Sequence, residues 1–182
     1  MSKRIYMILV IIPIMILAAC NHAVVEPNIR SVMDHETGNL LSLGERQSVF
    51  DRVLGQGELV PGSELSPVHQ YSYLDDIINV RFYDGVAVEI FATSRVEGYE
   101  RFEFYDTSWE MTDAMIETYF LDDVVHFRAF DAQGQELVQP FEPLEVYYVL
   151  EVINFYTMTG GQHSGMSIRI TNQRFFNELR GN

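Results

Sequence analysis

Cysteine is nearly absent from this chain, because Cys20 is the single cysteine among 182 residues. No disulfide can form within the chain, so packing alone must hold its folded part together. The one cysteine follows an apolar run and two alanines near the start of the chain.

Basic residues are also scarce, with 12 Lys and Arg against 26 Asp and Glu, a formal charge of -14, and lysine at position 3 alone. Loss of residues 1–19 would remove Lys3 and Arg4 and take the charge from -14 to -16. So acidic a body repels phosphate backbones and anionic headgroups, which excludes nucleic acid as a partner. Its aromatic share of 13% and apolar share of 47% are those of a globular protein.

The sequence contains no apolar run long enough to span a bilayer. Spanning takes about 20 residues, whereas residues 5–19 are fewer and are interrupted by Pro13. Lys3 and Arg4 precede this run and small residues follow it. We therefore predict a secretory signal peptide over residues 1–19.

The end of this segment, Leu17-Ala18-Ala19-Cys20, resembles the lipobox of bacterial lipoproteins. The resemblance implies cleavage between Ala19 and Cys20 and diacylglycerol on the Cys20 thiol. Several acyl chains anchor a protein stably, whereas one chain is marginal. We expect the domain outside the cytoplasm, on the cell membrane or the outer membrane, and Asn21 favours the outer membrane because it is not the aspartate that retains enteric lipoproteins. A cleaved signal with a free thiol and a buried structural cysteine remain as alternatives.

Three segments are predicted: a signal peptide over 1–19, a lipidated N-terminus and tether over 20–40, and one domain over 41–182. The tether prediction rests on polar residues with Pro27 and Gly38 and without sustained periodicity. A linker of this length reaches about 25 Å. Val24, Val25 and Val32 leave open a short edge strand within it.

Residues 42–55 predict a short helix. Ser42 and Glu45 have the spacing of a capping box, and Gly55 suits a left-handed helix end. The helix would bury one apolar face, which consists of Val49, Phe50, Val53 and Leu54.

Residues 78–90 predict a β-hairpin with two possible loops. A three-residue loop over 83–85 pairs Phe82 with Val86, whereas a two-residue turn over 84–85 pairs Tyr83 with Val86. The longer loop gathers the aliphatic side chains on one face and places a glycine where the left-handed conformation is required. We therefore predict the longer loop, with three residues facing outward: Arg81, Ala87 and Glu89.

A similar order of elements recurs along the chain. Residues 107–120 predict a second helix and residues 124–138 a strand, turn and strand, which indicates a weak tandem repeat of helix and hairpin. Residues 145–158 predict a long strand with its return strand at 166–171, and residues 172–181 predict either a terminal helix or a frayed strand. Because neither half could bury its helix stripe alone, we expect an α+β fold with two short helices packed on one antiparallel β-sheet.

The pattern Leu41-x-x-Gly44, Val49 and Leu54-Gly55 resembles small bacterial envelope lipoproteins related to the outer-membrane assembly lipoprotein of the small-protein-A type. It is also similar to domains of the β-lactamase-inhibitor-protein-like fold. Those families pack two helices on an antiparallel sheet and act by binding proteins. The resemblance implies this fold and this mode of action without identifying a partner.

Residues able to carry catalysis or bind metals are few and dispersed. The five histidines lack a second ligand at i, i+4 spacing, so we predict no metal site, no cofactor and no catalytic residue. Residues 160–165 predict a loop rather than a nucleophile elbow, because His163 stands where serine is required. Residues 131–136 predict a turn, and the pairs Asp75-Asp76 and Asp122-Asp123 predict solvated turn residues.

Two function classes remain. The favoured class is a non-enzymatic protein-binding module, an assembly factor or inhibitor, with an apolar patch and a charged rim. Its candidate contacts are Tyr71, Tyr73, Tyr83, Tyr99, Tyr105 and Trp109. The alternative is a lipoprotein enzyme or a receptor for a small ligand or cation, which would need a concave pocket with convergent carboxylates.

Overall fold

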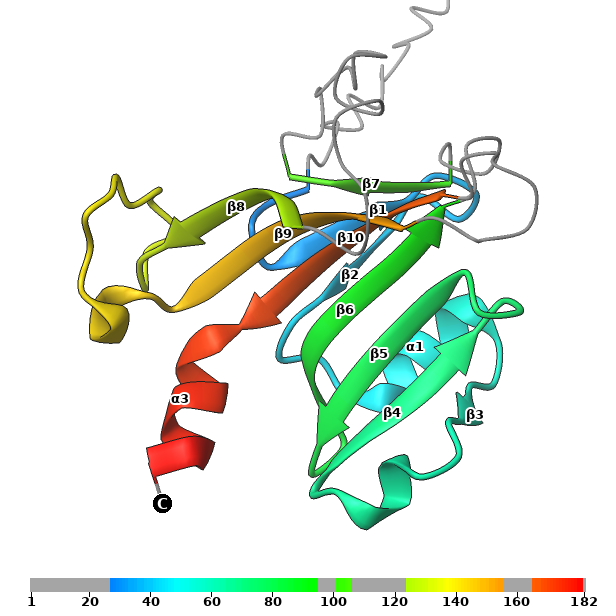
Figure 1. The fold of residues 1–182 in the computed structure, drawn as a ribbon. Helices are drawn as coiled ribbons and strands as arrows, with labels where there is room; N and C mark the ends of the chain where they lie inside the picture. The colour runs from blue at the N-terminus through cyan, green and yellow to red at the C-terminus, as the bar shows by residue number, and fades with distance from the viewer. Residues whose placement is uncertain (1–26, 95–100, 106–123, 156–164, 182) are drawn as a thin grey trace, which may run out of the picture.

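Two antiparallel β-sheets form the framework of the computed structural model, which describes residues 27–94, 101–105, 124–155 and 165–181 (Figure 1). The smaller sheet has the order β2-β1-β7 and the larger has the order β3-β4-β5-β6-β10-β9-β8. Within the described residues no helix has the length and apolar character needed to cross a membrane.

The three-stranded sheet consists of β1 (Ser31–Asp34), β2 (Asn39–Ser42) and β7 (Phe102–Phe104). Val32 of β1 and Leu41 of β2 are fully buried. Asp34 is also fully buried, and it forms a two-pronged ion pair with Arg101, at 3.0 and 3.1 Å. The folded part therefore begins before residue 41, and the predicted tether over 20–40 is wrong for residues 31–40, since an ordered hairpin occupies them.

The seven-stranded sheet has the short strand β3 at one edge and β8 at the other. Its strands are β3 (Glu58–Leu59), β4 (Val68–Tyr73), β5 (Ile78–Tyr83), β6 (Val86–Ser94), β8 (Val124–Phe130), β9 (Tyr148–Phe155) and β10 (Gly165–Asn172). Two short 3-10 helices, η1 (Ser63–Leu65) and η2 (Pro143–Glu145), lie in its connections. The long strand predicted over 145–158 and its return strand over 166–171 are confirmed by β9 and β10, which pair antiparallel.

Helix α1 (Gln47–Leu54) packs its apolar face on the seven-stranded sheet. Phe50 is fully buried, and its ring meets the ring of Phe82 edge to face at 5.3 Å. The predicted apolar face is confirmed, but the helix begins later than predicted, after Arg46, and Gly55 has a positive φ without the left-handed ψ. The Glu45 carboxylate still accepts a hydrogen bond from the Ser42 N–H at 3.0 Å, so this half of the capping box stabilises the turn before the helix.

The main core lies between the inner face of the seven-stranded sheet, α1 and the three-stranded sheet. It joins residues distant in sequence, among them Val32, Phe50, Ile90, Phe104 and Ile170, all essentially without exposed surface. A second, smaller apolar cluster of Ala129, Val146 and Val149 lies apart from it. Since successive side chains of a strand point to opposite faces, the residues between these core positions lie on the outer face of the seven-stranded sheet.

The register predicted for the β5–β6 hairpin is wrong. Tyr83 pairs with Val86 and Phe82 with Ala87, so the turn has two residues, Asp84 and Gly85. Both have positive φ, 49° and 71°, as a type I′ turn requires. A bulge then shifts the register between Phe82 and Arg81, which returns Val80 and Ile90 to one buried face. Ala87 was expected to face outward and is instead buried in the core.

The predicted α+β fold class, two helices on one antiparallel sheet, is also wrong. The described residues form ten strands in two sheets, and the three-stranded sheet, together with α1, covers the core that a second helix was expected to cover. The helix predicted over 107–120 lies outside the described residues. Residues 124–138 do not repeat the β5–β6 hairpin, because β8 pairs with β9 and meets its own return segment in a single bridge, Phe130 with Glu136. The terminal-helix alternative is confirmed by α3 (Gln173–Gly181).

Candidate functional site

A charged residue lies near the middle of each of four neighbouring strands in the seven-stranded sheet. These four, which we call the charged row, are Arg81 on β5, Glu89 on β6, Arg169 on β10 and Glu151 on β9. Arg81 is directly opposite Glu89, and Arg169 is directly opposite Glu151. Each of the four has at least one neighbour along its strand in the main core, so the charged row lies on the outer face of the sheet.

Ion pairs and hydrogen bonds connect the members of the charged row. The Arg81 Nη1 lies 3.2 Å from the Glu89 Oε1, and the Thr171 hydroxyl donates to the Glu89 Oε2 at 3.3 Å. The Arg169 Nε and Nη2 each lie 2.6 Å from the Glu151 Oε2. Each carboxylate therefore has a guanidinium partner, which lowers the cost of holding it near the sheet.

The two kinds of charge in the row differ in their exposure. The side chains of Arg81 and Arg169 are 43% and 28% exposed, whereas those of Glu89 and Glu151 are 9% and 16% exposed. The carboxylates are therefore more deeply buried than the guanidinium groups, which are closer to solvent. The row thus presents cationic hydrogen-bond donors on a chain whose overall charge is strongly negative.

Glu89 is the buried acid of the row. Burial raises the pKa of its carboxyl group above the ordinary value, because the charged form loses hydration. The guanidinium groups of Arg81 and Arg169 and the Thr171 hydroxyl oppose this rise in pKa, and the negative charge of Glu151 adds to it. Burial thus makes Glu89 hold its proton more tightly than an exposed glutamate does, although its arginine and threonine partners favour the charged form.

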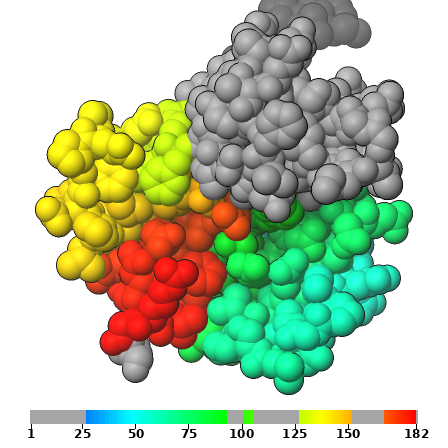
Figure 2. Space-filling view, in the orientation of Figure 1, coloured from blue at the N-terminus to red at the C-terminus, as the bar shows by residue number. Residues whose placement is uncertain are grey.

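A pocket of about 450 Å³ opens beside the charged row, between α3 and the segment from β3 to β4. Figure 2 shows this part of the surface as a hollow between α3 and the β3–β4 segment. Arg81 and Gln70 contribute polar groups to its lining. The apolar part of the lining consists of Val60, Pro61, Val68, Phe176 and Leu179.

Helix α3 forms one wall of this pocket, and contacts with Asn172, Tyr83 and Tyr147 hold its first turn in place. The Asn172 Oδ1 accepts a hydrogen bond from the Phe175 N–H at 3.1 Å, which caps the first turn. The Phe175 ring packs on Tyr83 with ring centroids 4.9 Å apart, and the Arg174 N–H donates to the carbonyl of Tyr147. The next turn then directs Phe176 and Leu179 toward the β3–β4 segment.

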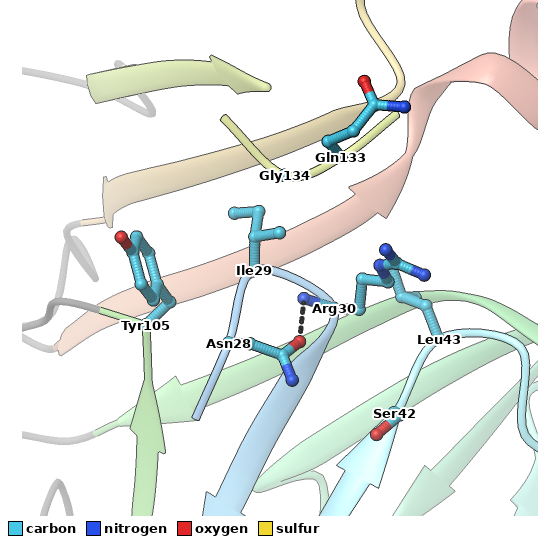
Figure 3. Close-up of a pocket in the computed structure, with 8 residues that line it drawn as sticks. All are labelled: Asn28, Ile29, Arg30, Ser42, Leu43, Tyr105, Gln133 and Gly134. Atoms are coloured by element: carbon cyan, nitrogen blue, oxygen red, sulfur yellow. Dashed lines mark hydrogen bonds between the residues drawn. The ribbon is translucent and has the colours of Figure 1, made fainter. Parts of the chain in front are cut away.

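A second pocket of about 390 Å³ lies at the other sheet, where the chain enters β1 (Figure 3). Asn28, Ile29 and Arg30 form its floor, with Tyr105 on one side and Gln133 on the other. The Tyr105 ring meets the Phe130 ring edge to face at 6.0 Å. Among the described residues no carboxylate lines this pocket or the pocket beside α3, whereas the enzyme or cation-receptor alternative predicted convergent acids.

The structure does not bring the predicted contact tyrosines together. Tyr73 is a core residue whose hydroxyl donates to the Asp51 Oδ1 at 3.0 Å, and its burial raises the pKa of the phenol. Tyr71 packs against the same core, Tyr83 supports α3, and Tyr105 lines the second pocket. Four predicted residues lie outside the described part of the chain: Ala19, Cys20, Tyr99 and Trp109.

Other predictions about chemically active residues concern surface positions. His35 is exposed and lies 2.9 Å from Glu103, and His69 is exposed on β4. Asp75 and Asp76 lie in the exposed β4–β5 turn, as predicted, and residues 131–134 form the predicted turn around Gly134. Across the described residues no group of three His, Cys, Asp or Glu could hold a metal ion.

Sequence reasoning missed the charged row as a site, although a signal was present. Arg81 and Glu89 were predicted to face outward, but as ordinary surface residues. Each of the four strands has a single charged residue within an otherwise apolar or uncharged stretch: INVRFY, VAVEIFATS, YVLEVINF and GMSIRITN. One charge near the middle of each strand indicates a polar row across a sheet. The strand order that makes the row continuous is seen only in the tertiary structure.

Comparison with protein-family models, with curated proteins and with solved structures found no match to this chain.

Proposed function

We propose that this chain is a bacterial envelope lipoprotein, anchored to the cell membrane or outer membrane through lipid on Cys20, whose domain is a non-enzymatic protein-binding module. Its binding surface is the outer face of the seven-stranded sheet, where the charged row meets the pocket beside α3. The membrane, through the lipid, and a protein are its partners.

One observation carries the binding part of the proposal: Arg81, which is paired with the buried Glu89, lines a pocket that also has apolar and aromatic walls. Arginine and aromatic side chains next to a desolvated pocket are typical of the residues that contribute most to protein interfaces. Phe176 lies in this pocket and Phe175 next to it. The four charges of the row are matched in pairs, which favours recognition over a reaction that consumes a free acid or base.

The binding part is tested by photo-crosslinking in intact cells that produce the chain naturally. A photo-reactive amino acid at Leu179 is expected to give a covalent adduct of defined size, whose partner is identified by mass spectrometry. The matched control places the same amino acid at Arg52, an exposed residue of α1, away from the pocket. Failure to form adducts at Leu179, Tyr105 and all other surface positions would contradict a protein-binding function.

The anchoring part is tested with Cys20→Ser. Cells fed an alkyne-tagged fatty acid are expected to label the wild-type chain and not the variant, because the lipobox cysteine is the acceptor. The variant is also expected to leave the membrane fraction, because in this proposal the lipid on Cys20 is what holds the chain to the membrane. Equal labelling and equal fractionation of both chains would show that Cys20 carries no lipid.

A second candidate function, a lipoprotein enzyme or small-ligand receptor, is favoured by Glu89 alone. A buried carboxyl group with a raised pKa beside a pocket is a candidate acid or base. Its two oxygens, however, are taken up by Arg81 and Thr171. The crosslinking experiment distinguishes the two candidates, because an enzyme of this kind needs no stable macromolecular partner.

A further inference from the structure

The pocket beside α3 combines an apolar wall with one guanidinium group that has unused donors. Arg81 donates through its Nε to the Gln70 Oε1 at 3.4 Å, and its Nη1 lies 3.2 Å from Glu89. Among the described residues Nη2 donates no hydrogen bond, and 43% of the side chain is exposed. A guanidinium group has five N–H donors in a planar fork, which suits a carboxylate.

Gln70 helps to fix the guanidinium group of Arg81, and both residues line the pocket. The Gln70 Nε2 donates to the Asn79 Oδ1 at 3.2 Å, which holds the amide so that its oxygen meets Arg81. Gln70 and Glu89 thus hold the guanidinium group from two neighbouring strands. Because it is held in advance, less side-chain entropy is lost when an anion binds.

The net charge of the chain limits which anions can use this donor. A body with formal charge -14 repels small free anions over the range set by salt screening. A carboxylate therefore needs a second source of affinity, and the apolar wall of Phe176, Leu179 and Val68 offers one. The cavity volume of about 450 Å³ is within the range of sites that take drug-sized ligands, and it suits a few side chains rather than a whole element.

We propose that this pocket binds an apolar peptide segment of the protein partner that carries one acidic side chain, with its carboxylate on Arg81 and its apolar neighbours against Phe176 and Leu179. This inference rests on the proposed protein-binding function and names the chemistry that its surface recognises. A fatty acid also has a carboxylate and an apolar chain but no peptide backbone, and sodium decanoate is the probe for it.

The test uses the processed lipoprotein in lipid nanodiscs and measures binding of two short peptides by calorimetry. The probe is acetyl-Leu-Glu-Leu-amide, and its neutral match replaces glutamate by glutamine. We expect the acidic peptide to bind about tenfold tighter or more, because a charge-assisted hydrogen bond is worth more than a neutral one. Equal affinity of the two peptides would overturn the proposal.

Two variants locate the site. The double variant R81Q/E89Q removes the guanidinium group without leaving Glu89 unpaired and is expected to abolish the preference for the acidic peptide. Leu179→Asn changes the apolar wall at a part-exposed position of α3 and is expected to weaken both peptides equally. Arg52→Gln, the control, removes a guanidinium group from the exposed surface of α1, away from the pocket, and is expected to leave both affinities unchanged.

The remaining outcomes separate this inference from the proposed function. Binding of sodium decanoate with binding of neither peptide would overturn the peptide proposal and assign the pocket to an amphiphile. A protein adduct in cells at Tyr105 but not at Leu179, with no preference for the acidic peptide, would overturn the inference and leave the binding module in place. A preference for the acidic peptide that survives in R81Q/E89Q would place the carboxylate elsewhere.

Discussion

Gly57 lies against the ring of Tyr73, and this contact defines what the residue can be. A Cβ added at Gly57 would lie 2.5 Å from Tyr73 Cζ, closer than real Cβ atoms approach carbon. The Gly57 N–H and the Tyr73 hydroxyl both donate to the Asp51 Oδ1, at 3.3 and 3.0 Å, so neither group can withdraw without breaking a hydrogen bond. Position 57 therefore requires glycine, because the Tyr73 ring leaves no room for a Cβ atom.

We expect Gly57→Ala to lower the free energy of unfolding by about 1–3 kcal/mol, the usual cost of overpacking a fixed site. Urea unfolding measures the change. Gly181→Ala is the matched control, because nothing lies within 4 Å of its added Cβ, and we expect a change within about 0.5 kcal/mol. Equal losses in the two variants would contradict the steric explanation.

Glu89 makes stability depend on pH with a defined sign. Its pKa in the folded chain is above the ordinary value of 4.5, so the folded state holds the proton more tightly than the unfolded state. The stabilisation by that proton is complete below the unfolded pKa and is lost as pH rises through the folded pKa. The free energy of unfolding contributed by this group therefore falls with rising pH.

We expect Glu89→Gln to remove this dependence, since glutamine does not titrate. The free energy of unfolding of the wild type, minus that of the variant, should fall as pH rises from about 4 to about 8. Urea unfolding across that range is the measurement, and Glu64→Gln, on the exposed η1, controls for the loss of one negative charge. A difference that rises with pH would be inconsistent with a buried Glu89.

Among the elements, the β5–β6 hairpin shows how a turn sets the surroundings of a whole strand. Asp84 and Gly85 both have positive φ, which gives the strands the twist that a two-residue turn needs. The bulge after the turn then places Glu89 opposite Arg81. The charged row therefore depends on this turn and this bulge together.

We expect Gly85→Ala to cost about 1–2 kcal/mol, the penalty for an L-residue in the left-handed conformation. Asp84→Asn should leave stability within about 0.5 kcal/mol, because asparagine also favours this turn. Thermal unfolding of the two variants compares them directly. If Gly85→Ala unfolded at the wild-type temperature, the two-residue turn would be wrong.

The sequence predicts some elements well because their signals are local. The strands β9 and β10 are rich in β-branched and aromatic residues, and α1 shows its apolar face within eight residues. The hairpin register was missed because a bulge changes the alternation near the start of β6, just after the turn, and alternation is the signal from which register is read. The strand β7 was missed, and β1 was left open only as an edge strand at Val32, because strands of three and four residues are too short to show a period.

At the scale of the whole molecule, the N-terminal boundary of the domain is the main consequence of the tertiary structure. β1 lies in the middle of the three-stranded sheet, between β2 and β7. Val32 and Leu41 are fully buried in the main core. A segment with ordinary linker composition is therefore part of the fold.

We expect a chain that begins at residue 27 to unfold cooperatively and a chain that begins at residue 41 to lack a cooperative transition. The shorter chain loses β1 and half of β2, which exposes the core side of β7 and leaves Arg101 without Asp34. Circular dichroism during heating distinguishes the two. Equal melting temperatures would restore residue 41 as the boundary.

The sequence by itself determined the strong acidity, the impossibility of an intrachain disulfide, the expected lipid anchor at Cys20 and the strands with local periodicity, since each depends on composition or on neighbours along the chain. The tertiary structure alone decided the two-sheet architecture, the burial of residues 31–34 and the charged row beside the apolar pocket. The physical reason is that the two local pairs, Arg81 with Glu89 and Arg169 with Glu151, form one row only because β6 pairs with β10, a strand distant in sequence. No local pattern specifies that order, because it depends on which strand edges bury the most apolar surface together.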